Sequence, residues 1–289
     1  ERAKLHKLRL RWPLPGEVPE GMVLVPGGPF LALPPGGQRL VRMDLPDFAI
    51  GRFPVTFREY VRFLEAIEDE AERARRMPGH EAGPLVERGP DGQWVLAARV
   101  IEGEEARRRV PEEHRFLTPV FEVSWFSACA YARWLSGQTG LRYRLPADTE
   151  WDKAMRGADG RRYPMGNFLD ASFAKLRASR PEATQLEPVG AFPLDESPYG
   201  VRDLAGGVGD WTATMLDGGR PPEPAEQGDA AQDGRQAYWR GGNWGSSGLV
   251  PGMRYPMALD RRTSGTGFRL ALLVPSATSS TLETEPLPY

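Results

Sequence analysis

The first part of the chain has short apolar runs separated by turn residues, a pattern that predicts β-strands. Residues 22–26 and 30–33 are two such runs, with Gly27 and Gly28 as turn residues between them. Segment 44–53 predicts a further strand pair around Pro46. At Thr56 the period becomes helical, because Thr56 and Glu59 have the spacing of a capping box before an amphipathic run that continues through Ile67. We therefore expect a helix near 56–70.

Two more helices are predicted further along the chain. Ser124 begins one that extends to about 136, where Gly137 and Gly140 end it, and a third covers about 147–156 with Gly157 as its C-terminal cap. Beyond Gly157 almost no helical periodicity remains, and glycine, proline and tryptophan separate short strands. Three helices among many short strands predict an α+β fold with much irregular structure.

The composition suggests one main domain with flanking segments. We interpret residues 1–20 as a linker or edge segment, 21–274 as the domain and 275–289 as a flexible tail rich in Ser, Thr and Pro. A charged, proline-broken stretch at about 73–117 is predicted to be an insertion, with a short hairpin near 93–101.

Charge and hydropathy exclude several classes of partner. The 37 basic and 39 acidic residues give a net charge of −2, which provides no global basic field for nucleic acid or an anionic membrane. No apolar run approaches the roughly 18 residues of a membrane span, so membrane insertion is not expected. No signal peptide opens the chain, and we therefore expect a cytoplasmic location.

Few residues are candidates for redox or metal chemistry. The single cysteine, Cys129, excludes an internal disulfide and is predicted to be a small buried residue in the middle of a helix. The three histidines, His6, His80 and His114, fall in the linker and the insertion and do not predict a metal site.

The tryptophans and one glycine-rich loop give more specific expectations. Trp125, Trp134, Trp151 and Trp211 are predicted to pack in the core, whereas Trp244, between glycines, is predicted to lie at a surface or groove. The loop at 200–211 lacks the lysine and the context of a phosphate-binding loop. We interpret it as a structural turn, with calcium as its candidate ion at Asp203 and Asp210.

Several ordered segments resemble the formylglycine-generating-enzyme (sulfatase-modifying factor) family, whose fold is a variant of the C-type lectin fold. The resemblance spans about 20–273. It rests on 21–28 (GMVLVPGG), 51–56 (GRFPVT), 123–125 (VSW), 144–151 (RLPADTEW), 203–211 (DLAGGVGDW), 240–244 (RGGNW) and 267–269 (GFR). The ordered set is far more specific than any one of these motifs.

The resemblance implies the scaffold but not the oxidase chemistry. The oxidising members use a copper-binding cysteine pair in a segment that corresponds here to 245–266, which contains no cysteine. Related iron-dependent sulfoxide synthases take their histidines from an extra helical domain that we do not find in this sequence. Gly207 and Asp210 stand where the family's loop has Asn and Glu, which weakens the implied calcium site. We therefore expect no copper or iron, and a protein that is not an enzyme.

Three functions remain open at this point. The first, which we favour, is a ligand-binding variable protein of a diversity-generating retroelement. Of residues 245–266 only Met253 and Met257 belong to types that adenine mutagenesis of AAY codons cannot produce, where about four would be expected from the chain's 51 in 289. The second is a sensor or docking domain of a bacterial Ser/Thr kinase, fused upstream. The third is an oxidoreductase with an altered metal site near Arg254, Tyr255, Asp260 and Arg261.

The first function predicts a binding surface on the C-terminal segment at 243–266. Flanking glycine turns would anchor its ends while its interior varies, and the partner would be an unidentified protein or surface ligand. The predicted contact residues are Asn243, Trp244, Ser246, Ser247, Leu249, Met253, Arg254, Tyr255, Met257, Asp260, Arg261, Arg262, Thr263 and Ser264.

Overall fold

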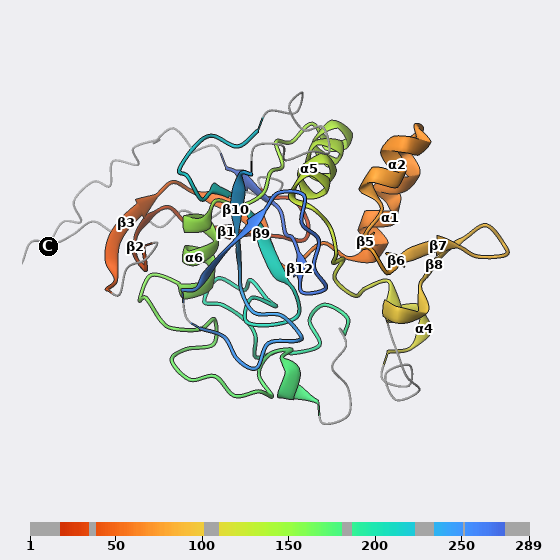
Figure 1. The fold of residues 1–289 in the computed structure, drawn as a ribbon. Helices are drawn as coiled ribbons and strands as arrows, with labels where there is room; N and C mark the ends of the chain where they lie inside the picture. Colours follow the sequence, from red (N-terminus) through yellow and green to blue (C-terminus); the bar gives the residue numbers. More distant parts are fainter. Residues whose placement is uncertain are drawn as a thin grey trace, which may run out of the picture.

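Two small sheets form the centre of the molecule (Figure 1). The structure is a computed structural model that describes residues 18–34, 39–100, 110–180, 187–222, 234–250 and 252–274. The first sheet has the order β1 (Met22–Val25), β4 (Phe48–Gly51), β13 (Ala271–Leu273) and is antiparallel. The second has the order β11 (Arg254–Ala258), β10 (Gln236–Arg240), β9 (Gly209–Met215), β12 (Thr266–Gly267), and only the β9–β12 pair is parallel.

Three two-stranded ribbons lie outside these sheets. They are β2 (Gly28–Ala32) with β3 (Val41–Leu45), β5 (Gly79–His80) with β6 (Gly83–Pro84), and β7 (Val86–Arg88) with β8 (Trp94–Leu96). Figure 1 shows the β2–β3 ribbon and the elements of the insertion on opposite sides of the molecule.

The longer helices begin where the sequence predicts, because local caps fix their first turns. In α1 (Phe57–Ala66) the Thr56 hydroxyl accepts from the Glu59 amide, and in α5 (Trp125–Thr139) the Ser124 hydroxyl accepts from the Ser127 amide. Helix α6 (Asp148–Arg156) ends at Gly157, whose φ of 71° lies in the left-handed region. Shorter helical elements in the described ranges include α4 (Glu112–Arg115) and the 3₁₀ turns η1 (Ala98–Val100) and η2 (Arg177–Ser179).

Two boundaries differ from the expectation. The helix predicted near 56–70 ends early: α1 stops at Ala66 and Ile67 is extended. Asp69 then caps a separate helix, α2 (Glu70–Arg76), by accepting from the Glu72 amide. The hairpin expected near 93–101 is β7–β8 instead, and 98–100 is a 3₁₀ turn. The predicted tail and most of the predicted linker lie outside the described residues.

The core fills the space between α1, α5 and the second sheet. Trp125, Trp151 and Trp211 are buried as predicted, whereas Trp134 is half-buried at the edge of the main cluster. A second cluster packs Trp151 of α6 against the first sheet. No helix in the described ranges is long and apolar enough to cross a membrane.

Candidate functional site

The C-terminal segment at 243–266 leaves the second sheet after β10, returns as its edge strand β11, and enters β12. Its two ends are held together, because the amide of Trp244 donates to the Gly207 carbonyl at 2.8 Å and the indole N–H donates to the Ser264 carbonyl at 2.7 Å. Among the described residues of this segment, only Leu259, Gly265 and Thr266 are buried. The segment is therefore a largely accessible strip anchored at both ends.

An aromatic pair stands on the edge of the second sheet. Trp239 of β10 and Tyr255 of β11 are directly paired, and their rings stack with centroids 4.4 Å apart and planes 20° from parallel. The Trp239 ring lies against Gly209, where any Cβ would overlap the indole. Both rings are partly exposed, and burial raises the pKa of Tyr255. We call Trp239 and Tyr255 the aromatic face.

Several predicted contact residues are instead engaged with the rest of the fold. Arg254 donates through Nε to the Asp148 carboxylate at 2.7 Å, and Arg262 donates to the backbone carbonyls of Arg75, Met77 and Gly79. Met257 and Trp244 pack against the main core, and Leu249 packs against a small apolar cluster beside η2. These side chains hold the strip in place.

The other predicted residues are more accessible to a ligand. Ser247, Met253, Asp260, Arg261 and Ser264 are exposed, and neither Asp260 nor the Arg261 side chain makes a hydrogen bond or ion pair with a described residue. The half-buried polar residues form local hydrogen bonds. The backbone N–H of Asn243 donates to the Ser246 hydroxyl, and the hydroxyls of Thr263 and Thr266 share a hydrogen bond.

The insertion forms part of this site, which the sequence did not indicate. A cavity of about 240 Å³ is lined by Asp260 and Arg262 together with Arg75 of α2 and Ser124 and Phe126 at the start of α5. On the other side of Arg262 a cavity of about 630 Å³ is lined by residues of the insertion from Ala74 to Pro84. Arg262 therefore joins the strip to the insertion through contacts between residues more than 180 positions apart.

The loop expected to hold calcium has a different source of positive charge. Asp210 accepts from the Arg269 guanidinium at 2.6 Å and from the Trp151 indole at 2.8 Å, whereas the Asp203 carboxylate accepts from the Gly190 amide. Within the described ranges no group of three or more His, Cys, Asp or Glu side chains is placed to hold a metal ion. Arg269 therefore lies at Asp210, where the cation was expected, and calcium at Asp203 and Asp210 stays a prediction.

A buried acidic group next to this loop was not found from the sequence. Asp195 accepts hydrogen bonds from the amides of Leu204, Ala205 and Gly206, and burial raises its pKa to about 7. Burial also raises the pKa of Asp203 to about 6. The ammonium group of Lys175, itself buried, lies 3.4 Å from the Glu187 carboxylate, and these two residues line a small space together with Asp195 and Asp203. The group positions the loop and faces no open cavity.

Cys129 and the histidines lie apart from the strip. Cys129 is half-buried on α5 rather than fully buried as predicted, and burial of its thiol raises the pKa to about 12, which keeps it protonated at neutral pH. His80 lies 3.0 Å from the buried Glu122, His114 is exposed on α4, and His6 lies outside the described residues.

The fold and the strip define a C-type-lectin-like domain with an accessible C-terminal face, and sequence comparison shows its family. The sulfatase-modifying factor enzyme 1-like domain matches residues 13–273. The chain therefore belongs to the formylglycine-generating-enzyme (FGE-sulfatase) family.

Curated relatives include enzymes. The hercynine oxygenase of Mycolicibacterium smegmatis is 31% identical over 290 residues, covering 86% of this chain and 60% of that protein. The formylglycine-generating enzyme of Thermomonospora curvata is 32% identical, covering 69% of this chain and 73% of that enzyme. The serine/threonine-protein kinase Pkn1 of Chlamydia trachomatis is 29% identical, covering 66% of this chain and 27% of the kinase. The chain thus spans less than two thirds of the oxygenase and about a quarter of the kinase.

Solved structures confirm the fold. PvdO from Pseudomonas aeruginosa superposes with a TM-score of 0.61 at 24% identity, covering 87% of this chain and 94% of that one. Treponema denticola variable protein 1 superposes with a TM-score of 0.59 at 17% identity and the same coverage.

The expectation that the protein is not an enzyme is wrong. It rested on two missing features, the copper-binding cysteine pair and the extra helical domain that supplies iron-binding histidines. Relatives that match most of this chain are named as oxygenases and as formylglycine-generating enzymes.

Proposed function

We propose that this chain is the substrate-binding domain of an enzyme related to the hercynine oxygenases, and that the substrate binds on the C-terminal strip. The observation that carries the proposal is the partly exposed Trp239–Tyr255 stack beside a strip that is anchored at both ends. Aromatic faces attract organic cations, and rigid aromatic side chains contribute binding energy with little loss of conformational entropy.

The charges on the strip support a ligand that carries both signs. Asp260 and Arg261 are adjacent, exposed and unpaired with any described residue, so a zwitterion can interact with both. Hercynine, the compound in the relatives' name, is a betaine with a permanent trimethylammonium cation and a carboxylate. Its cationic group suits an aromatic face, and its carboxylate suits an exposed guanidinium.

Calorimetric titration of the chain with hercynine tests this proposal. We expect measurable binding that weakens about tenfold in Tyr255→Ala and in Asp260→Asn, and weaker binding of histidine, which lacks the quaternary cation. Trp94→Ala is the matched control, because Trp94 is a half-buried tryptophan of the insertion that contacts Arg88 rather than the strip. Absence of hercynine binding, or binding equally weakened in the control, contradicts the proposal.

A docking role in a kinase is a second candidate. It is favoured by the relatives named Pkn1, in which the matched region is a minor part of a longer kinase. The complete reading frame tests it: kinase signature motifs in the same polypeptide support this role, and a complete frame without them contradicts it.

Diversification of the strip by a retroelement is a separate prediction about the same residues. Ser247, Met253, Asp260 and Arg261 can vary without loss of core contacts, whereas a change at Arg254 leaves the buried Asp148 with one cation fewer. A template repeat beside the gene, with adenines at the codons of the exposed positions, is the expected finding. A neighbourhood without a repeat and a reverse transcriptase contradicts it.

A further inference from the structure

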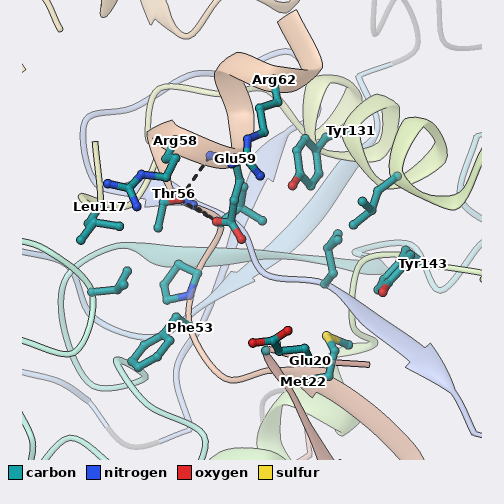
Figure 2. Close-up of a pocket in the computed structure, with 17 residues that line it drawn as sticks. Glu20, Met22, Phe53, Thr56, Arg58, Glu59, Arg62, Leu117, Tyr131 and Tyr143 are labelled. Carbon is teal, nitrogen blue, oxygen red and sulfur yellow. Dashed lines mark hydrogen bonds between the residues drawn. The ribbon is translucent and has the colours of Figure 1, made fainter. Parts of the chain in front are cut away.

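A cavity away from the C-terminal strip has the features of a built ligand site. It has a volume of about 420 Å³ and lies between α1, α5 and the ends of β1 and β4 (Figure 2). Its apolar wall includes Val55, Leu117, Leu135 and Leu270, and no residue of the strip lines it. This volume is within the range of small-molecule sites.

The hydroxyl of an otherwise buried tyrosine, Tyr131, opens onto this cavity. Tyr131 is 3% exposed, and its ring is fixed by a stack on Tyr60 with centroids 5.8 Å apart and by edge contacts with Phe63 and Phe268. Figure 2 shows its hydroxyl directed toward the cavity, and it makes no hydrogen bond with a described residue. The neighbouring Tyr60 hydroxyl, by contrast, donates to the Arg76 carbonyl at 2.8 Å. Because the Tyr131 hydroxyl opens onto the cavity and has no described partner, it is available to a ligand.

Charged side chains of opposite sign face each other across the same cavity. Arg62 extends from α1 on one side and Glu20 lies on the other (Figure 2), and neither makes a hydrogen bond or ion pair with a described residue. Glu59 is held by the Thr56 amide at 2.8 Å and hydroxyl at 2.6 Å, and Arg58 donates to the Glu113 carbonyl at 3.4 Å. Arg62 and Glu20, both exposed, are therefore the two charged side chains of the lining that have no described partner.

We propose that this cavity binds a small zwitterion with an apolar body, in the size class of a free apolar α-amino acid. The carboxylate pairs with Arg62 and accepts from the Tyr131 hydroxyl, and the ammonium group lies toward Glu20. The apolar side chain of the ligand packs against the apolar wall of the cavity. The lining carries two arginines and two glutamates, so a ligand with a single charge meets repulsion from one of the two pairs, and a zwitterion meets a partner at each end.

Three probes that share one phenyl group separate the contributions of the two charges. L-phenylalanine carries both charges, 3-phenylpropionate only the carboxylate, and 2-phenylethylamine only the ammonium. By calorimetry at pH 7 we expect phenylalanine to bind about tenfold more tightly than either of the other two. Equal binding of the three probes, or no binding of phenylalanine at millimolar concentration, overturns the proposal.

Two pairs of variants distinguish a ligand role from a structural one. Tyr131→Phe is expected to keep or raise the thermal midpoint of the free protein, because it removes an unpartnered hydroxyl, and to weaken phenylalanine binding about tenfold. Tyr60→Phe is its control, with a lowered midpoint and unchanged binding, because it breaks the bond to the Arg76 carbonyl. Arg62→Ala weakens binding, whereas Arg42→Ala, an equal loss of charge on β3, leaves it unchanged.

A lowered midpoint in Tyr131→Phe together with wild-type affinity would assign this hydroxyl a structural role and overturn the proposal. Because hercynine is also a zwitterion, the Tyr131→Phe variant enters its titration too. Loss of hercynine binding there but not in Tyr255→Ala would place hercynine in this cavity and leave the strip without a substrate.

Discussion

Replacing Asp148 by Asn is expected to be among the most destabilising isosteric changes in this protein. Asp148 is 2% exposed and accepts from Arg240 at 2.6 Å and from Arg254 at 2.7 Å. Asp152, also buried, accepts from Arg240 and from Arg156 at 3.1 Å. The network thus holds three guanidinium groups against two carboxylates.

The charge balance gives the size of the effect. In Asp148→Asn three buried guanidinium groups share the single carboxylate of Asp152, and breaking a buried ion pair in this way costs about 3–5 kcal/mol. In Arg254→Met two guanidinium groups remain against two carboxylates, so we expect a smaller loss of about 1–2 kcal/mol from one charged hydrogen bond. Removing the surplus cation should also rescue the first variant: Asp148→Asn with Arg254→Met is expected to be more stable than Asp148→Asn alone.

Equilibrium unfolding in guanidinium chloride at pH 7 measures the unfolding free energies of the two single variants and the double variant relative to the wild type. Unchanged m-values are the check that the variants unfold alike. The test is whether Arg254→Met raises or lowers the unfolding free energy of the Asp148→Asn protein. If Arg254→Met destabilises the Asp148→Asn protein further, the charge-balance reasoning is refuted. The Arg254 contact would then act through packing.

Three further predictions concern other parts of the molecule. Burial raises the pKa of Asp195 to about 7 and of Asp203 to about 6, so the folded state binds protons that the unfolded state has released. The unfolding free energy should therefore fall as pH rises from about 4 to 7, by up to about 1.4 kcal/mol per pH unit for each proton. Asp203→Asn should flatten this slope. Gly209→Ala should cost about 1–3 kcal/mol and alter the near-ultraviolet circular dichroism, because its Cβ overlaps the Trp239 ring, whereas Gly248→Ala meets no atom within 4 Å and should change neither. The Cys129 thiol, with its pKa raised to about 12, should react with a thiol reagent at pH 8 only after unfolding, and Cys129→Ala should cost about 1 kcal/mol; rapid labelling of the native protein would contradict its burial.

Local interactions are the part of this fold that the sequence determined. The starts of α1 and α5 were predicted to within one residue, because their caps are bonds between residues three positions apart, and Gly157 ends α6 as predicted because its positive φ favours glycine. The ordered motifs likewise identified the family, since they lie on these elements and on the glycine turns around the second sheet. The end of α1 was missed because the helical pattern of apolar residues continues through Ile67, while the backbone there is already extended.

Only the tertiary structure decided which side chains of the strip face outward. Arg254 and Arg262 are charged residues in a segment rich in glycine and serine, and the sequence assigned them to a ligand. The structure pairs them with Asp148, 106 positions away, and with carbonyls of the insertion up to 187 positions away. The same holds for Arg269, which lies beside Asp210 where calcium was expected, and for the cavity that Tyr131 lines, whose walls come from seven separate stretches of chain. Which charged side chains form pairs depends on how the chain folds back on itself. The spacing of residues along the sequence does not give the distance between two side chains in space.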